Sequence, residues 1–409
     1  TGARDWYGQG GNHCRLLPGA GADAGEHDRA ARAGRYRESG AQALQNLRRG
    51  RRFKDSGKSI SHDCGCAWHR LRTADRIAET LGIERDSTFR VSAGIRYTLE
   101  YALGEGHTYL LRDHLLRLSM RLLGVAPEKV EECLDELLSN DTLVEESIDD
   151  QPSVGVVWVR QGEKDVAERL LRLADEPCEL QDLHLEEHLH ALEQAENTVL
   201  DPSQREAVLE ALCGGVTVLT GGPGTGKTTI TRFIIRLMLS LGLSVELGAP
   251  TGRAAKRMAE ATGFEARTLH RLLEYGRGPG AVFARNETTP LECDAVIVDE
   301  VSMVDIFLMR QLLNAIPPGA RLVLVGDADQ LPSVGPGNVL ADILRSGRIR
   351  AVKLQKIFRQ SERSRIVVNA HRINAGEMPD LDGGEDFLFH SADYRDFERP
   401  CPPPVGYPR

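Results

Sequence analysis

Apolar residues follow two different spacings along the chain, and the change comes near residue 200. Between residues 71 and 196 they recur every three to four positions, which predicts helices. We expect helices at 71–82, 90–103, 111–123 and 127–138, and amphipathic linker helices over 164–196. The stretch SVGVVWVR at 153–160 predicts a strand. The helix pair before it and this strand fit a winged helix or a plain helical bundle with one hairpin.

After Asp201-Pro202, short apolar runs alternate with helical segments. The runs are bounded by Gly and Asp, which is typical of strands in a parallel sheet with helices on both faces. We expect strands at 216–220, 244–250, 295–300, 321–327 and 351–355. The fold class is therefore α/β, preceded by a mainly helical region.

The two ends of the chain differ from this middle part. Residues 1–70 contain 13 Lys and Arg against seven Asp and Glu, 12 Gly and only five branched aliphatic residues. So little apolar surface does not offset the entropy of ordering, so we expect a poorly folded leader, as a frameshifted reading would produce. Residues 393–409 end in CPPPVGYPR and predict a disordered tail. We divide the chain into 1–70, 71–195, 196–392 and 393–409.

Composition excludes several classes of protein. The chain of 409 residues has a net charge of −9. Its eight irregularly spaced Cys favour a reducing, cytoplasmic compartment. The apolar stretch at 233–243 is interrupted by Arg236 and Ser240 and is shorter than the roughly 18 residues of a membrane span. The first ten residues lack a signal-peptide pattern. Secreted, membrane and collagen-like proteins are excluded.

The sequence GGPGTGKT at 221–228 fits the phosphate-binding pattern G-x-x-x-x-G-K-[ST] between an expected strand and an expected helix. Gly222, Gly224 and Gly226 let the backbone turn tightly, so that its N–H groups face phosphate oxygens. Lys227 supplies a positive charge for the β- and γ-phosphates, and Thr228 supplies a hydroxyl for Mg²⁺. We predict a nucleotide site here that includes Thr225 and Thr229.

A carboxylate pair follows the strand AVIV at 295–298. Asp299 would lie at the carboxyl end of that strand, where ligands bind in open α/β sheets, and would hold Mg²⁺. Glu300 is the candidate base that orients the attacking water. Taken without the phosphate-binding loop, such a pair more often marks only the start of a helix.

Two further residues follow later strands. Gln330, in the polar loop after 321–327, is placed to touch a γ-phosphate. Arg359, in LQKIFRQ, would neutralise charge on the transferred phosphoryl group. Together these features predict hydrolysis of a nucleoside triphosphate on a doubly wound sheet.

Two segments between the loop and Asp299 carry a basic set of residues. APTGRAAKRM (249–258) and ARTLHRLLE (266–274) contribute Arg253, Lys256, Arg257, Arg267 and Arg271. Such a set can follow a phosphate backbone, with Thr251, Thr268 and His270 hydrogen-bonding phosphates or sugars. On composition alone, a solvated helix face explains it equally well.

The ordered motifs resemble superfamily 1 DNA helicases of the RecD-like group. They are DPSQREAV, GGPGTGKT, APTGRAAKRM, TLHRLL, VDEVSMVD, GDADQLPSVGPG and FRQ, and they span roughly 195–378. TADRIAETLGI resembles the end of a helix-hairpin-helix element in the family's N-terminal half. The resemblance implies ATP-driven, 5′ to 3′ translocation on single-stranded DNA with unwinding at duplex junctions. It also implies ATP and Mg²⁺ as cofactors, recombination-repair subunits as partners, and a nucleoid-associated location in a bacterial-type cytoplasm.

The resemblance also assigns residues to roles. Gln204 would contact the adenine, and Gln330 and Arg359 would reach the γ-phosphate. The residues expected near single-stranded DNA are Pro250, Thr251, Arg253, Thr268 and His270.

The family has two motor domains with ATP between them, and this sequence ends soon after Arg359. We therefore expect the chain to bind ATP and to bind single-stranded DNA weakly, without unwinding duplex by itself. Two alternatives are a DNA-binding module with a silent ATPase and a P-loop ATPase that acts on protein. His62, Cys64, Cys66 and His69 are competent zinc ligands, but at a non-standard spacing.

Overall fold

The computed structural model describes residues 83–176, 184–276, 281–356, 364–382, 386–387 and 389. Several predictions lie outside these residues: the leader and its His/Cys cluster, the helix expected at 71–82, Arg359, and the tail. Among the described helices, none is long and apolar enough to span a lipid bilayer.

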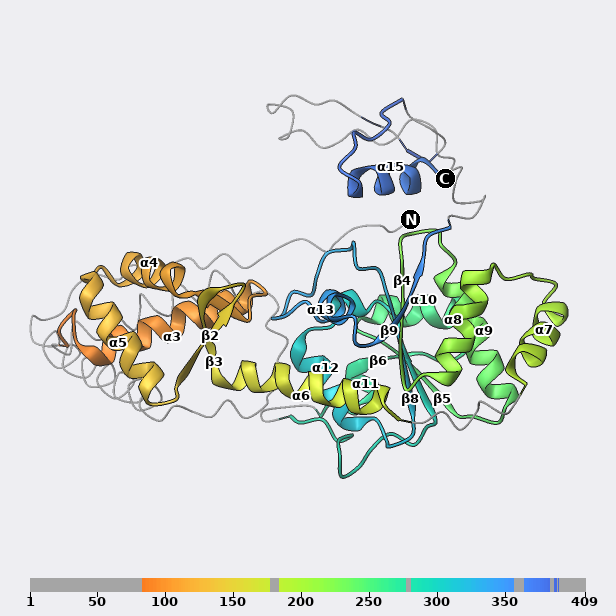
Figure 1. The fold of residues 1–409 in the computed structure, drawn as a ribbon, viewed down its shortest axis with the longest axis horizontal. Coiled ribbons are helices and arrows are strands. Elements are labelled where there is room, and N and C mark those ends of the chain that lie inside the picture. The colour runs from red at the N-terminus through yellow and green to blue at the C-terminus, as the bar shows by residue number, and fades with distance from the viewer. Residues whose placement is uncertain are drawn as a thin grey trace, which may run out of the picture. The chain divides into compact units, whose positions relative to one another are not determined.

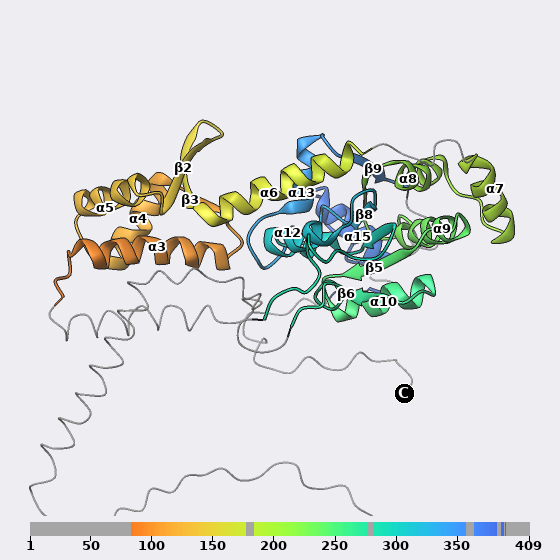
Figure 2. The ribbon, with the colours of Figure 1, turned by 90° about the horizontal axis from the view of Figure 1, so that it is seen from below.

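The N-terminal described part consists of three helices and a small antiparallel sheet (Figure 2). The helices are α3 (Thr88–Gly104), α4 (Arg112–Leu123) and α5 (Pro127–Ser139); the strands are β1 (Tyr109–Leu111), β2 (Leu143–Ile148) and β3 (Gln151–Val156). The three helices match those expected from the periodicity of apolar residues. The strand order β1-β3-β2, with β1 between α3 and α4, favours the winged-helix alternative.

These six elements share a core of their own. Its members come from residues 91–154 only and include the fully buried Ile95, Leu115 and Leu134. The helix ends have identifiable signals: the Ser87 side chain caps α3, and Gly124 ends α4 in the left-handed conformation.

The strand predicted at 153–160 is wrong beyond Val156. Helix α6 (Val157–Ala174) begins there, and its buried residues Val159, Val166, Leu170 and Leu173 recur at helical spacing. The apolar run VVWV fits a strand or a buried helix start equally well, and only the later spacing distinguishes them. Helices α6 and α7 (Leu185–Ala195) confirm the helices expected over 164–196.

The second part is a six-stranded sheet in the order β6-β5-β7-β8-β4-β9, with every pair parallel. The strands are β4 (Val216–Gly221), β5 (Val245–Ala249), β6 (Arg267–Thr268), β7 (Ala295–Val298), β8 (Arg321–Gly326) and β9 (Arg350–Leu354). The α/β fold class and all five expected strands are confirmed. The two-residue strand β6 is additional.

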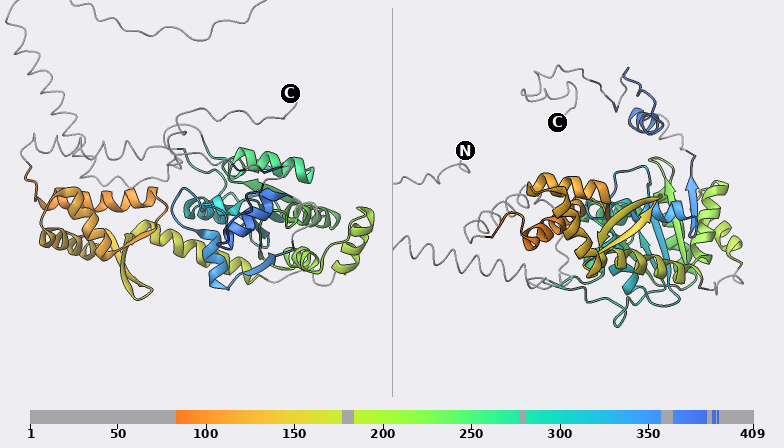
Figure 3. Two further views of the ribbon diagram at one scale, coloured as in Figure 1. Left: turned by 90° about the horizontal axis from the view of Figure 1, so that it is seen from above. Right: turned by 60° about the vertical axis from the view of Figure 1, so that its left-hand side comes forward.

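Helices cover both faces of this sheet (Figures 1 and 3). They are α8 (Pro202–Cys213), α9 (Lys227–Ser240), α10 (Gly252–Thr262), α11 (Leu269–Leu272), α12 (Ile306–Ala315) and α13 (Val339–Ser346), with a short 3₁₀ helix, η1 (Val301–Met303). A further helix, α15 (Arg365–Asn374), follows β9 along the chain. Alternate residues of the central strands β4, β7 and β8 enter two cores. Val296 and Val298 pack with α6, α12 and α13, whereas Ala295 and Ile297 pack with α8 and α9.

Candidate active site

The loop between β4 and α9 has the geometry of a phosphate cradle. Gly224 and Gly226 have φ angles of 78° and 86°, a region that residues with a side chain rarely adopt. Thr225 is 2% exposed, and its hydroxyl donates to the carbonyl of Gly222 over 2.9 Å. This bond closes the loop on itself.

Lys227 begins α9 and folds over the loop. Its ammonium donates to the Gly222 carbonyl over 3.0 Å and to the Gly221 carbonyl. Burial lowers its pKa, and the charges of Asp327, Asp299 and Glu300 oppose that shift. The cation is therefore partly desolvated, which strengthens its attraction for an incoming anion.

Asp299 and Glu300 follow β7, and they lie at the same edge of the sheet as the loop because β7, β8 and β4 are parallel neighbours. Burial raises the pKa of both carboxyls, while Lys227 and Arg257 favour the charged forms. The Asp299 carboxylate accepts a hydrogen bond from the Glu300 N–H over 2.9 Å. The structure thus brings together Lys227, Asp299 and Glu300, three of the residues predicted to bind and hydrolyse nucleotide.

Glu300 has a left-handed backbone, with φ 55° and ψ 43°. For a residue with a side chain this conformation costs about 1–2 kcal/mol. Strain of this kind persists where the surrounding structure fixes it, and it is common at functional sites. At Glu300 it lies on the residue predicted to act as the base.

The oxygen donors at this edge suit a hard divalent cation. Thr228 offers an exposed hydroxyl at the first turn of α9, and Asp299 offers a carboxylate with a raised pKa. Magnesium prefers such oxygen ligands and retains several waters, so two protein ligands suffice. The residues present fit Mg²⁺ bound together with a nucleotide.

Asp327 was not singled out from the sequence as a site residue. It follows β8, between the strands that carry Asp299 and the loop, and is 3% exposed. Among the three carboxylates that face Lys227, it contributes most to holding the ammonium charged. The available signal was an Asp directly after an apolar strand, the same signal that marks Asp299.

Gln204 and Gln330, both predicted to contact the nucleotide, differ from each other in burial. Gln204 is 4% exposed, and its side-chain oxygen accepts from the Asp201 N–H over 3.1 Å, which completes a capping box at the start of α8. Its contact with adenine stays a prediction. Gln330 is exposed in the turn after β8, where its N–H donates to the Asp327 carbonyl over 3.2 Å.

The predicted DNA contacts lie at the carboxyl ends of β5 and β6. Pro250 follows β5, and Thr251 caps α10 by accepting from the Ala254 N–H over 3.2 Å. Thr268 caps α11 in the same way, accepting from Arg271 over 3.3 Å. Capping uses a hydroxyl lone pair, so both hydroxyl hydrogens can still be donated to a phosphate.

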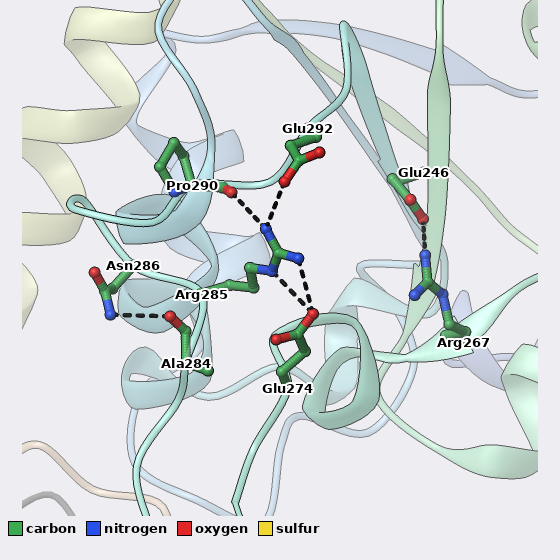
Figure 4. A network of polar contacts seen from close by, with 8 residues as sticks. All are labelled: Glu246, Arg267, Glu274, Ala284, Arg285, Asn286, Pro290 and Glu292. Carbon is green, nitrogen blue, oxygen red and sulfur yellow. Dashed lines mark hydrogen bonds and ion pairs between the residues drawn. The ribbon is translucent and has the colours of Figure 1, made fainter.

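The basic residues of these two segments differ in whether their charge is already paired within the protein. Arg253 is exposed, whereas Arg267 is paired with Glu246, as Figure 4 shows. The same figure shows Arg285, which bonds Glu274, Glu292 and the Pro290 carbonyl and so fixes the segment before β7. Arg253 is therefore better placed than Arg267 to bind an external phosphate.

His270 packs against aromatic rings. Its ring centroid lies 5.7 Å from that of Tyr275 and 5.8 Å from that of Phe283. Burial lowers its pKa, while Asp305 opposes the shift. A neutral imidazole can still donate one hydrogen bond to DNA, so its predicted role stays open to test.

Comparison with known proteins places these motifs in a family context. Residues 204–336 match the family described as an AAA domain, and residues 68–109 match the ATP-dependent RecD2 DNA helicase HHH domain. The chain is 48% identical over 177 residues to the ATP-dependent RecD2 DNA helicase of Deinococcus radiodurans, covering 43% of this chain and 24% of that protein. It is 43% identical over 199 residues to the RecBCD enzyme subunit RecD of Mycobacterium tuberculosis, covering 42% and 34%.

The resemblance to RecD-like helicases is thus confirmed. The chain spans about a quarter to a third of the length of these two relatives. A crystal structure of Pif1 helicase from Candida albicans is 27% identical over 44% of this chain and 45% of that chain, with a TM-score of 0.34.

Proposed function

We propose that this chain, a homologue of RecD-like DNA helicases across its P-loop region, is the ATP-hydrolysing motor of a DNA translocase. The observation that carries the proposal is the meeting of Lys227, Asp299 and Glu300 at one edge of the parallel sheet. The helix α10, which Thr251 caps, starts from the same edge. Nucleotide and DNA candidates therefore lie on connected elements.

Each residue would have a defined part in hydrolysis. The backbone of residues 222–228 would bind the phosphates, and Lys227 would neutralise charge that develops on the β- and γ-phosphates. Thr228 and Asp299 would hold Mg²⁺, which supplies further charge neutralisation when bound. Glu300 would accept a hydrogen bond from the attacking water and orient it in line. Gln330 and Arg359 would contact the γ-phosphate.

The proposed DNA contacts are those at the ends of β5 and β6. Thr251 and Thr268 would donate to phosphate oxygens, and Arg253 would add a positive charge. Pro250 and His270 would line the same path. Single-stranded DNA is the proposed partner, with duplex junctions and 5′ to 3′ movement as properties of the whole protein. We also propose recombination-repair subunits as protein partners and the cytoplasmic nucleoid of a bacterium as the location.

Steady-state ATPase activity, measured with and without a single-stranded oligonucleotide, tests the proposal. We expect magnesium-dependent turnover that the oligonucleotide stimulates and that Lys227→Ala abolishes. Glu300→Gln should abolish turnover while leaving ATP binding intact. Turnover without stimulation would favour an ATPase that acts on protein. DNA binding without turnover would favour a silent module.

A further inference from the structure

The three glycines assigned to the phosphate cradle do not share one reason for being glycine. Gly224 and Gly226 have positive φ angles, which exclude most other residues. Gly222 is not among the positive-φ residues of the described chain. Its lack of a side chain needs another explanation.

The explanation is a contact from α15, a helix far away in sequence. A Cβ built on Gly222 would lie 2.5 Å from Cε1 of His371, and 3.3 and 3.4 Å from the two ring nitrogens. The same imidazole lies 3.3 Å from the Pro223 carbonyl, measured from Nε2. A carbonyl only accepts, so Nε2 carries the hydrogen in this contact. The imidazole thus occupies the space that a side chain at position 222 would need.

Helix α15 is held by its own framework of hydrogen bonds. Asn369 is 2% exposed; its amide donates to the Asp380 carbonyl over 2.9 Å and accepts from the Asp380 N–H over 2.8 Å. Ser364 caps the helix, and Arg365 pairs with Asp380. These contacts fix the helix against the segment that follows it, and His371 projects from that unit toward the loop.

His371 and Lys227 contact the same turn of the loop. The carbonyls of Gly221 and Gly222 accept from the Lys227 ammonium, and the next carbonyl, of Pro223, faces His371. A shift of the imidazole would therefore move the backbone that positions the ammonium. A change at α15 would reach the phosphate site through this turn.

We propose that His371 is a positioning residue of the nucleotide site, whose imidazole packs on Gly222 and fixes the turn that holds Lys227. The inference deepens the proposed nucleotide binding and rests on it. It also gives Gly222 a reason to be glycine, because a methyl group there would displace the His371 imidazole from the turn.

A double-mutant cycle tests the assignment, with binding of the fluorescent nucleotide N-methylanthraniloyl-ATP and Mg²⁺ as the readout. Gly222→Ala should weaken affinity by about tenfold or more, since the methyl group would displace the imidazole and disturb the turn. His371→Ala should weaken it by roughly threefold, because the turn loses its support. Gly222→Ala combined with His371→Ala should bind within about threefold of His371→Ala alone. His371→Gln, which keeps a donor for the Pro223 carbonyl, should bind more tightly than His371→Ala.

Gly224→Ala is the matched control. Its defect comes from a φ of 78°, so removal of the imidazole should not rescue it. Thermal unfolding of each variant checks that the fold is intact. The inference is overturned if the Gly222→Ala defect persists unchanged without the imidazole, or if His371→Ala rescues both glycine variants equally. Failure of the parent chain to bind the nucleotide would overturn the proposed function as well, which separates the two failures.

Discussion

The carboxylate of Asp299 is held at a cost to the protein's own stability. Burial is the main cause of its raised pKa, so the folded state disfavours the charged form. A group with a raised folded pKa stabilises the fold below its unfolded pKa, and that contribution is lost as pH rises through the folded value. At neutral pH the ionised carboxylate therefore destabilises the nucleotide-free protein.

Asp299→Asn should accordingly raise the unfolding temperature of the nucleotide-free protein at neutral pH, by about 2–4 °C for a gain of roughly 1 kcal/mol. The difference from the parent chain should shrink on acidification, when the parent carboxyl takes up a proton. The same variant should lose the additional stabilisation that Mg²⁺ gives in the presence of ATP. Calorimetry between pH 4 and 8 measures both effects, and a variant less stable than the parent at pH 7 would contradict them.

Glu300 has a raised pKa for a related reason. Burial contributes most, and the neighbouring Asp299 charge adds to it. A base must be ionised to orient water, so the acid limb of the ATPase pH profile should lie above that of an ordinary Glu. Turnover at saturating ATP and Mg²⁺, measured from pH 5 to 8, tests this. Bound Mg²⁺ reduces the rise in the pKa of Glu300, so the acid limb of the pH profile should move to higher pH when Mg²⁺ is limiting. An acid limb at the pKa of an ordinary Glu in both conditions would refute the assignment.

At the start of α10, a structural role and a DNA-binding role of one residue can be tested separately. Thr251 caps the helix and is also predicted to contact DNA. Thr251→Ala should destabilise the protein by about 1 kcal/mol, because one N–H of the first turn loses its acceptor. Thr251→Asp should keep the cap, since a carboxylate also accepts, but should repel a phosphate.

If Thr251 contacts DNA, the Asp variant will match the parent in thermal unfolding and lose affinity for a single-stranded oligonucleotide in fluorescence anisotropy. Equal DNA affinity of the parent and the Asp variant would assign the threonine to capping alone. The salt dependence of binding gives a second check, because loss of a phosphate contact reduces its slope.

Elements whose signals are local were predictable from the sequence. The strand before GGPGTGKT is a buried apolar run, and the same holds for the strands before Asp299 and Asp327, so their order along the chain predicts a shared edge. The start of α6 was not predictable, because VVWV satisfies strand and helix patterns alike. The contact of His371 with Pro223 joins residues 148 positions apart, and no local pattern marks it.

On the scale of the whole molecule, the described chain contains separate hydrophobic cores. The residues of α3, α4, α5 and their small sheet form one core, and the two faces of the parallel sheet form two others. The sheet holds both of its cores together, since β4, β7 and β8 contribute buried residues to both. The N-terminal core shares no buried residue with them.

This division predicts unfolding in two transitions, one for the N-terminal core and one for the two cores of the sheet. Leu134→Ala, at a fully buried position of the N-terminal core, should lower the free energy of unfolding of that core by about 2–5 kcal/mol. It should leave the affinity for ATP unchanged. ATP with Mg²⁺ at a hundred times its Kd should raise only the free energy of unfolding of the sheet part, by about 2.7 kcal/mol. Differential scanning calorimetry of the parent and the variant, each with and without ATP, resolves both effects. A single transition that both Leu134→Ala and ATP shift would mean that the cores unfold together, and that the N-terminal part senses the nucleotide site.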